Sequence, residues 1–388
     1  MSELRPGAPL KVGFIGGGID SAIGRAHFGA LHIDRKFSLE SGIFSIDELA
    51  NKESAEFYGV SNERVYNSIE KFLAEETGKL DAVIVLTPTP LHFEHINALF
   101  DKKIAVISEK ALCTNSKDAH LLTQRVVNEN QFLSITFTYT GYPIIRQIKE
   151  MIAAGEFGDL LSIHVEMPQE SFIKSGPSGE AAKPQAWRQQ DYELPSVTLD
   201  LGSHVVNLVE FVAGAKISEI AGMANHAGDV ARLIDNVLAI GTMNNGTQIS
   251  LSWNKISLGK RNGLALKIYG ENAAVSWEQE SPEYLSFTGK DGVTKMLDRS
   301  NPLMNVAAEM RYSRFKPGHP AGYIEAFANL YLDIATDLVA YKNRVVKKVV
   351  EASNNPYTHD AINSYEGLKI LETLHESAKI GKTLPIKR

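Results

Sequence analysis

Short apolar runs alternate with helical patterns through the first 138 residues. The apolar runs of strand length lie at 11–15, 39–44, 81–86, 104–107 and 132–136. Segments with helical spacing of apolar residues lie between them, at 21–32, 48–58, 92–100 and 116–128. Near-continuous apolar strands are typical of parallel sheets covered on both faces. The alternation therefore predicts an α/β domain over residues 1–138, with a doubly wound parallel sheet.

The hydrophobic pattern changes after this region. Residues 143–154 form an amphipathic helical pattern that ends at Gly155. Residues 247–253 alternate with period two, and 264–269 with 273–277 read as a hairpin. We expect a C-terminal α+β domain, residues 139–388, with an open-faced, largely antiparallel sheet covered by helices on one face. The last helices belong to that domain or pack back on the first one.

Composition and charge narrow the class of protein. A chain of 388 residues fits two domains, and 46 acidic against 40 basic residues give a net charge of −6. This balance argues against a nucleic-acid partner, and the apolar runs are too short to span a membrane. The single cysteine, Cys113, and the absence of a secretory signal pattern predict a cytoplasmic protein. The open sheet face predicts a homo-oligomer, a dimer or a tetramer.

A glycine-rich turn follows the first predicted strand. Gly16, Gly17 and Gly18 end this strand, and Gly24 is the next glycine. Such glycines let the backbone approach a pyrophosphate, whose charge the following helix N-terminus favours. The spacing is longer than G-x-G-x-x-G, and glycines also serve plain turns. Its place in a β-α-β pattern nevertheless predicts a Rossmann domain that binds a dinucleotide.

The end of the second strand is the place where such domains read the adenosine ribose. Ser45 stands there, and Asp47 is close. Serine does not repel a 2′-phosphate as a carboxylate would, yet no arginine follows to hold one. The choice between NAD and NADP stays open, with NAD favoured. In the alternative interpretation Ser45 begins a loop and Asp47 caps the next helix.

Two later motifs, with the glycine turn, resemble the Gfo/Idh/MocA oxidoreductases. Thr87-Pro88 with His92 follows the third strand, and Glu109-Lys110 follows the fourth. The resemblance implies that the first segment lines the nicotinamide side and that Lys110 lies at cofactor and substrate. Ala111 stands where the family usually has a proline, often in a cis bond. Together with the glycine turn and the end of the second strand, the resemblance gives a cofactor-binding set: Gly16, Gly18, Gly24, Ser45, Thr87, Pro88, His92, Glu109 and Lys110.

The second domain carries further matches to the same family. Asp200 and His204 stand as in its D-x-G-x-H motif, which faces the substrate carbinol. Their spacing puts both on one face if the segment is helical. The resemblance implies a sugar or polyol substrate and a substrate-binding set: Lys110, Tyr139, Arg188, His204 and His319. The polar segment 171–195 reads as a long loop near a site.

Oxidation of a secondary alcohol requires loss of a hydride from carbon and of a proton from oxygen. Lys110, Asp200 and His204 are the catalytic candidates, with either Lys110 or His204 as the first proton acceptor. Asp200 is expected to orient His204, and Glu109 to hold the Lys110 ammonium. No metal is expected, because H-E-x-x-H and a thiolate cluster are both missing. The alternative is a dinucleotide-binding regulator without turnover.

Overall fold

The computed structural model describes residues 8–180, 183–230, 232–347 and 355–388. The chain forms two compact units, which are described separately. Unit 1 comprises Met1–Cys113, Lys117–Gly141 and Gly322–Tyr365. Unit 2 comprises Thr114–Ser116, Tyr142–Ala321 and Glu366–Arg388. The sequence predicted a boundary after residue 138 and left open whether the last helices pack back on the first domain; the described residues of 322–365 cluster with unit 1.

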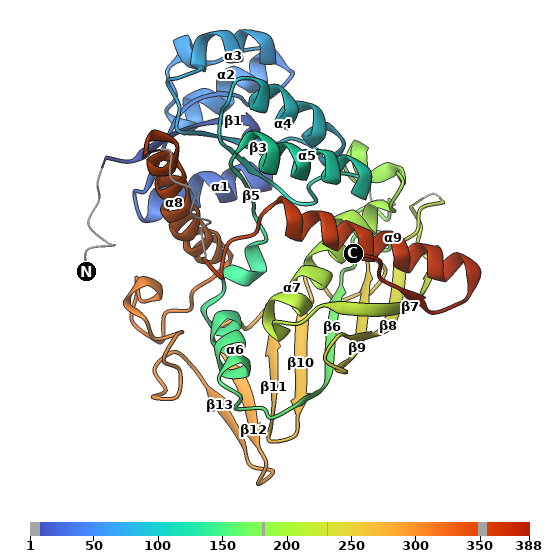
Figure 1. Cartoon of the computed structure of the whole chain (residues 1–388). Coiled ribbons are helices and arrows are strands. Elements are labelled where there is room, and N and C mark those ends of the chain that lie inside the picture. The colour runs from blue at the N-terminus through green and yellow to red at the C-terminus, as the bar shows by residue number, and fades with distance from the viewer. Residues whose placement is uncertain (1–7, 181–182, 231, 348–354) are drawn as a thin grey trace. The chain divides into compact units, whose positions relative to one another are not determined.

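The described part of unit 1 contains a five-stranded sheet with the order β2-β1-β3-β4-β5 (Figure 1). Its strands are β1 (Leu10–Gly16), β2 (Phe37–Ile43), β3 (Ala82–Leu86), β4 (Val106–Ser108) and β5 (Leu133–Ile135). All neighbours are parallel, which confirms the predicted doubly wound sheet. A parallel bridge from Gly42 to Val65 adds a rudimentary strand beside β2 and completes the Rossmann order. The order reverses between β1 and β3, where such folds bind ligands.

Helices surround this sheet. They are α1 (Ala22–Ile33), α2 (Glu48–Tyr58), α3 (Ile69–Glu76), α4 (His92–Asp101), α5 (Ser116–Glu129) and α8 (Tyr323–Lys347). The buried face of α8 includes Phe327, Leu330 and Ile334 at helical spacing and packs on α1. A helix more than 300 residues from the N-terminus thereby shares the core of the first sheet. No helix within the described ranges is long and apolar enough to cross a membrane.

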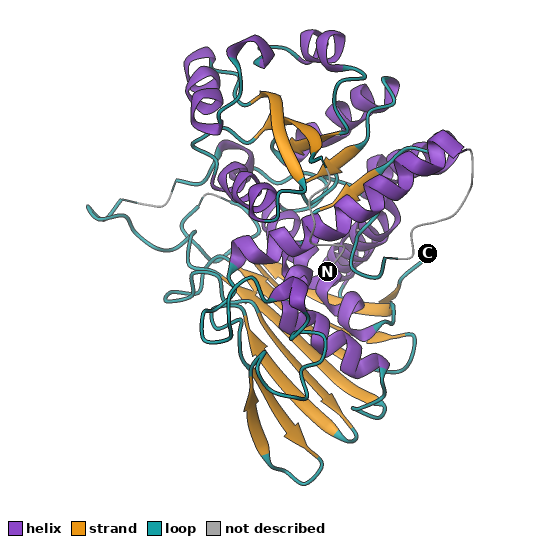
Figure 2. Cartoon of the chain, turned by 90° about the vertical axis from the view of Figure 1, so that its left-hand side faces the viewer, coloured by secondary structure: helices purple, strands orange, loops and turns teal. Residues whose placement is uncertain are grey.

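The described part of unit 2 contains a nine-stranded sheet with the order β13-β12-β11-β10-β6-β9-β8-β7-β14. Figure 2 shows these strands as one broad layer. The strands are β6 (Leu160–Pro168), β7 (Ile217–Asn225), β8 (Asn236–Met243), β9 (Gln248–Asn254), β10 (Ala265–Gly270), β11 (Ala273–Glu278), β12 (Leu285–Gly289), β13 (Thr294–Leu297) and β14 (Leu384–Pro385). Only β6 and β9 pair in parallel among the neighbours described, so the prediction of a largely antiparallel sheet is confirmed.

Helices lie over one face of this sheet. The helices α6 (Pro143–Ala153) and α7 (Ser203–Ala213), with the unit 2 part of α9 (Ala361–Ile380), cover it (Figure 1). Ile249, Leu251 and Trp253 are buried on that face, as their period-two spacing predicted. The opposite face carries Leu238 and Ile240, which are 48% and 65% exposed. The sheet is therefore open on one side.

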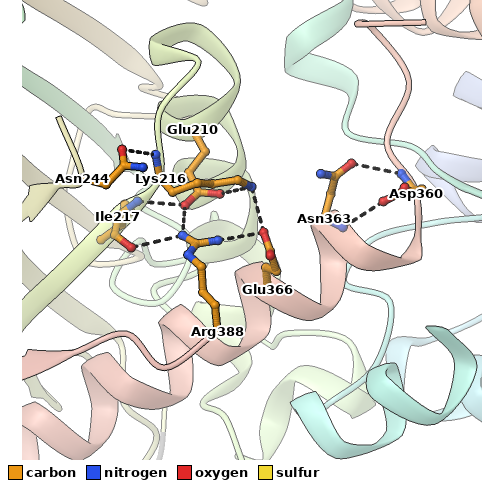
Figure 3. A network of polar contacts seen from close by, with 8 residues as sticks. All are labelled: Glu210, Lys216, Ile217, Asn244, Asp360, Asn363, Glu366 and Arg388. Carbon is orange, nitrogen blue, oxygen red and sulfur yellow. Dashed lines mark hydrogen bonds and ion pairs between the residues drawn. The ribbon is translucent and has the colours of Figure 1, made fainter. Parts of the chain in front are cut away.

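A ring of alternating charges fixes α9 to α7 and β7 (Figure 3). Glu210 accepts hydrogen bonds from Lys216 at 2.9 Å and Arg388 at 2.6 Å, and also from the Ile217 amide at 2.9 Å. Glu366 accepts from the same two cations, at 2.8 and 2.7 Å. Burial lowers the pKa of Lys216, but the hydrogen bonds and charges of the two glutamates outweigh burial and raise it above its ordinary value. The lysine therefore remains charged at neutral pH.

Candidate functional site

At the glycine turn after β1 the backbone passes very close to neighbouring backbone segments. Gly16 and Gly17 have φ of +85° and +73°, which side chains rarely adopt. A Cβ on Gly16 would lie 2.7 Å from the Thr87 nitrogen, and one on Gly24 would lie 2.0 Å from the Gly17 oxygen. Gly24 thus lets α1 approach the turn despite its late position in the sequence. This bare backbone beside a helix N-terminus fits a pyrophosphate.

Side chains that the sequence analysis missed hold this turn. Ser21 caps α1 by accepting from the Gly24 amide at 3.2 Å. Ser54 on α2 accepts from the Ile19 amide at 2.9 Å. Tyr58 donates to the Gly17 oxygen at 2.8 Å, and burial raises the pKa of Tyr58 to about 12. Serine and tyrosine in helical patterns give no local signal of these contacts.

The structure gives Asp47 a capping task. Its carboxylate accepts from the Ala50 amide at 2.8 Å at the start of α2, so the alternative interpretation of Asp47 is confirmed. Ser45 lies two residues beyond the end of β2, and its hydroxyl accepts from the Asp47 amide at 3.1 Å. The half-buried Ser45 stays our candidate for the ribose contact.

His92 joins the loops that follow β3 and β4. Its Nε2 lies 2.8 Å from the Thr87 oxygen and its Nδ1 2.9 Å from the Ala111 oxygen. Burial lowers the pKa of His92, so the ring is neutral and donates to one of the two carbonyls. Thr87 in turn places its hydroxyl 3.1 Å from His95 Nδ1, and Pro88 is exposed. This geometry supports a positioning task for His92; its predicted cofactor contact stays a prediction.

Glu109 is buried and committed to neighbours within unit 1. Its Oε1 lies 3.0 Å from His27 Nε2 and also accepts from Thr136, while its Oε2 accepts from the Lys110 amide at 3.2 Å. Burial raises the pKa of Glu109, but His27, the Lys110 charge and Thr136 outweigh burial and lower it. The Lys110–Ala111 peptide bond is cis, the form often found at the family's proline. The Glu109 carboxylate thus contacts a buried histidine, a threonine and the Lys110 backbone.

The series of buried side-chain contacts continues from Glu109 through His27 to α8. His27 Nδ1 lies 2.5 Å from the Tyr331 hydroxyl, and the His27 ring packs on Phe327 at 4.6 Å between centroids. His27 is fully buried, although the sequence analysis did not select it. Its place on the apolar face of α1, three residues before Ala30, is the signal that could have found it.

We expect a His27→Phe variant to lose about 3 kcal/mol of unfolding free energy, because the buried Glu109 carboxylate loses its principal donor. Urea unfolding measures this loss. The exposed His32, on the same helix, supplies the control, and His32→Phe should change stability by less than about 0.5 kcal/mol. Equal small effects of the two substitutions would contradict the role given to His27.

In unit 2, Asp200 lies on a π-helical turn, η5 (Thr198–Gly202), that leads into α7. Such turns are frequent at functional sites. A Cβ on Gly202 would lie 2.8 Å from the Trp253 ring, so the glycine of the D-x-G-x-H motif lets this turn pack on the sheet. Trp253 Nε1 also donates to the Thr198 hydroxyl at 3.2 Å. The sheet thereby fixes the turn that carries Asp200. The same turn leads into α7, where His204 is the second residue.

Asp200 is held by two cations. Arg188 donates through Nη2 to Oδ1 at 2.9 Å and through Nε to Oδ2 at 3.0 Å. Lys255 donates to Oδ2 at 2.6 Å. The Arg188 turn belongs to the predicted long segment 171–195, which reaches a site residue at this point. The structure thus adds two cationic partners to a carboxylate that the sequence analysis paired with His204 alone.

The remaining candidates have different surroundings. His204 is buried in the first turn of α7, and Tyr139 is buried in the 3₁₀ turn η3 (Thr138–Gly141) of unit 1. His319 is exposed, and its carbonyl accepts from the buried Arg299 at 3.1 Å. Among the predicted substrate residues, Arg188 is brought to Asp200. The substrate contacts of Tyr139 and His319 remain predictions.

A buried histidine with a lowered pKa, His375, anchors the turn that carries Asp200. The Thr198 hydroxyl accepts from Trp253, so it donates to His375 Nε2, 2.8 Å away. Burial and then Lys379 lower the pKa of His375 from 6.5 to about 4. The unfolded chain therefore binds more protons between these pH values, and stability falls as pH falls through this window.

We expect the unfolding free energy to fall by roughly 2 kcal/mol between pH 7 and pH 5 through His375 alone. A His375→Gln variant should lack this part of the dependence, while His164→Gln, at an exposed histidine of the same unit, should keep it. Urea unfolding at the two pH values measures the difference. An identical pH dependence in wild type and His375→Gln would refute the assignment.

Comparison with known proteins agrees with this geometry. Residues 10–137 match the profile of the oxidoreductase family with an NAD-binding Rossmann fold, and residues 145–276 match the GFO/IDH/MocA C-terminal domain. The chain belongs to the Gfo/Idh/MocA oxidoreductase family. The predicted family, fold class and nicotinamide dinucleotide cofactor are thereby confirmed, and unit 1 is an NAD(P)-binding Rossmann domain.

Relatives cover nearly the whole chain. The uncharacterised oxidoreductase YfiI of Bacillus subtilis is 27% identical over 381 residues, 96% of this chain and 95% of that protein. Glucose-6-phosphate 3-dehydrogenase of the same organism is 23% identical over 300 residues, 75% of this chain and 78% of that protein. An inositol dehydrogenase homologue from Azotobacter vinelandii, solved with NADH and myo-inositol, is 25% identical, covers 97% of each chain and has a TM-score of 0.86.

Proposed function

We propose that this oxidoreductase is an NAD(P)-dependent dehydrogenase that acts on a secondary alcohol of a sugar, sugar derivative or inositol-like polyol. The observation that carries the proposal is the Asp200 carboxylate, held by Arg188 and Lys255 four residues before a buried histidine, His204. A regulator that only binds a dinucleotide has no need of a fixed acid/base set. Family membership and the polyol-linked relatives support the substrate class.

Different residues of this chain would bind the cofactor, take up the proton and stabilise the charge that develops on the substrate oxygen. A bound NAD(P) would supply the hydride acceptor for the carbinol carbon. The glycine turn and the α1 N-terminus would hold the pyrophosphate. His204 would take the hydroxyl proton as general base, or receive it by way of Lys110. The Lys110 ammonium would stabilise negative charge that develops on the same oxygen.

A substrate panel tests this function. The protein is mixed with NAD or NADP and with hexoses, sugar phosphates, pentoses and inositols, and reduced nicotinamide is followed by absorbance. We expect reduction with a subset of these polyols. Tight cofactor binding with no reduction by any of them would favour the dinucleotide-binding regulator instead.

Cofactor choice can be tested at Ser45. If Ser45 approaches the adenosine ribose, a Ser45→Asp carboxylate should repel a 2′-phosphate and shift the NAD/NADP preference toward NAD by roughly tenfold, about 1.4 kcal/mol. The exposed Ser61 gives the control, because Ser61→Asp adds the same charge elsewhere on unit 1. Kd values for both nucleotides measure the shift. An unchanged ratio in Ser45→Asp would place the ribose elsewhere.

We also propose that the open sheet face of unit 2 pairs with a second copy of the chain. Met223 and Leu238 are opposite each other on β7 and β8, and Ile240 lies on the same face. Sedimentation should give a dimer or tetramer for the wild type and a smaller species for Ile240→Lys, because a buried unpaired charge disfavours an interface. A monomeric wild type would rule this pairing out.

A further inference from the structure

We propose that Lys255 is a positioning residue of the catalytic site, which fixes the Asp200 carboxylate from the rigid side of the site. This inference rests on the proposed dehydrogenase function. Lys255 continues the period-two series of Ile249, Leu251 and Trp253, so its side chain follows the buried face of β9. A lysine at that parity is the exception in an otherwise apolar row.

The backbone of Lys255 is fixed on both sides. Its amide donates to the Asp235 oxygen at 3.0 Å, and its carbonyl accepts from the Phe172 amide at 2.8 Å. The side chain is 6% exposed, with Nζ 2.6 Å from Asp200 Oδ2 and 5.1 Å from the centroid of the Phe172 ring. The ammonium therefore reaches Asp200 from a backbone position held between the residue before β8 and Phe172, directly after β9.

Fold stability is a poor explanation of this buried charge. Replacing a buried ion pair by apolar residues is often neutral or stabilising, so such a pair is weak evidence for a stabilising role. The partner of Lys255 indicates another role, because Asp200 belongs to the acid/base set of the proposed function. Groups that act on a substrate need supports that keep them within about 0.5 Å of the productive geometry.

Lys255 and Arg188 hold the same carboxylate in different ways. Arg188 lies on a 3₁₀ turn within the irregular segment 171–195, and its side chain is 25% exposed. Lys255 directly follows the last residue of β9, a central strand, and its side chain is 6% exposed. The lysine is thus the inner, fixed partner, and the arginine the outer one. With Lys255 removed, we expect the orientation of Asp200 to follow the loop.

The chain offers a matched control at Lys149. Lys149 is half-buried, and its Nζ donates to the Phe211 oxygen at 2.8 Å and lies 4.6 Å from the centroid of the Phe211 ring. Lys149 therefore shares the aromatic contact of Lys255, although Lys149 is half-buried and Lys255 is buried. Its recorded hydrogen-bond partner is a carbonyl on α7 and not a site carboxylate.

The test is a kinetic double-mutant cycle with the best substrate of the panel. Lys255→Met should lower kcat by roughly 10²-fold, the loss expected for a misplacement of about 1 Å, with smaller effects on KM and on NAD(H) affinity. Lys255→Arg, which keeps the charge, should recover most of this loss. Lys149→Met should keep wild-type kcat. In an Asp200→Asn background, Lys255→Met should have little further effect, because both act through one carboxylate.

The possible results distinguish failure of the positioning role of Lys255 from failure of the proposed dehydrogenase function. Wild-type kcat in a folded Lys255→Met protein, or an equal loss with and without the Asp200→Asn change, overturns the positioning role. Thermal unfolding and NADH binding verify that each variant is folded. Lys255→Gln, which also removes the charge, replaces Lys255→Met if the latter does not fold, and it should show the same loss of kcat. A wild-type protein inactive with every panel substrate overturns the proposed function, and this inference with it. A Lys255→Met protein with wild-type kcat overturns the inference alone.

Discussion

Replacing His204 by alanine is expected to lower kcat by roughly 10²–10⁴-fold, because the reacting hydroxyl loses its general base. Lys110→Ala should cause a loss of similar order and also raise KM, since a charged hydrogen bond to the substrate disappears. NAD(H) affinity should stay close to wild type in His204→Ala, because the cofactor set lies in unit 1. Steady-state kinetics and a separate binding titration measure these effects.

The controls for this prediction lie in the same units. His226→Ala removes a histidine of unit 2 that faces Asp235 at 3.1 Å, and Lys102→Ala removes an exposed lysine of unit 1. Both should keep wild-type kcat. The kcat of the His204→Ala/Lys110→Ala double variant should fall by much less than the product of the two single losses, because the effects of groups that act together in one step are not additive. Near wild-type turnover in both single variants would remove the catalytic assignment and leave the fold in place.

The second large effect is expected at the glycine turn. Gly16→Ala should abolish NAD(H) binding, because its Cβ would lie 2.7 Å from the Thr87 nitrogen in the turn that approaches the pyrophosphate. Gly78 has nearly the same φ, +83° against +85°, but a Cβ there meets nothing within 4 Å. Gly78→Ala therefore shares the backbone strain, about 1–2 kcal/mol, without the clash, and should bind NAD(H) normally.

Isothermal titration with NADH compares these two variants. Gly18→Val extends the comparison, because Gly18 lacks a positive φ and its Cβ would be 3.0 Å from the Phe44 oxygen. This variant should fold and bind at least about 10²-fold more weakly, or 2.7 kcal/mol. Wild-type affinity in folded Gly16→Ala or Gly18→Val would show that the turn is not the pyrophosphate site.

Local hydrophobic patterns in the sequence predicted many of the strands and helices of the fold. The apolar runs at 81–86 and 132–136 became β3 and β5, and the period-two segment 247–253 became β9, because each pattern reflects burial next to its own neighbours in the chain. The parallel pairing of β6 with β9 and the return of α8 to unit 1 had no such signal. Both depend on contacts between distant segments, which no local period encodes.

The same distinction applies to the site. The glycine turn and the motif around Asp200 were visible because their chemistry lies within a few residues. The partners of these residues were not: His27 is 82 positions from Glu109 and 304 from Tyr331, and Lys255 is 55 positions from Asp200. A polar residue on an otherwise apolar face marks both His27 and Lys255. That mark indicates burial with a partner but does not identify the partner.

The most direct test of the account is to follow the transferred atom itself. The protein is incubated with NAD or NADP and with the panel polyol that supports turnover, deuterated at its carbinol carbons, and the reduced nucleotide is analysed by mass spectrometry. We predict one deuterium in each reduced nucleotide formed by the wild type, and greatly reduced formation by His204→Ala. Reduced nucleotide without deuterium, or a nucleotide that binds and is never reduced, would contradict hydride transfer from a secondary alcohol.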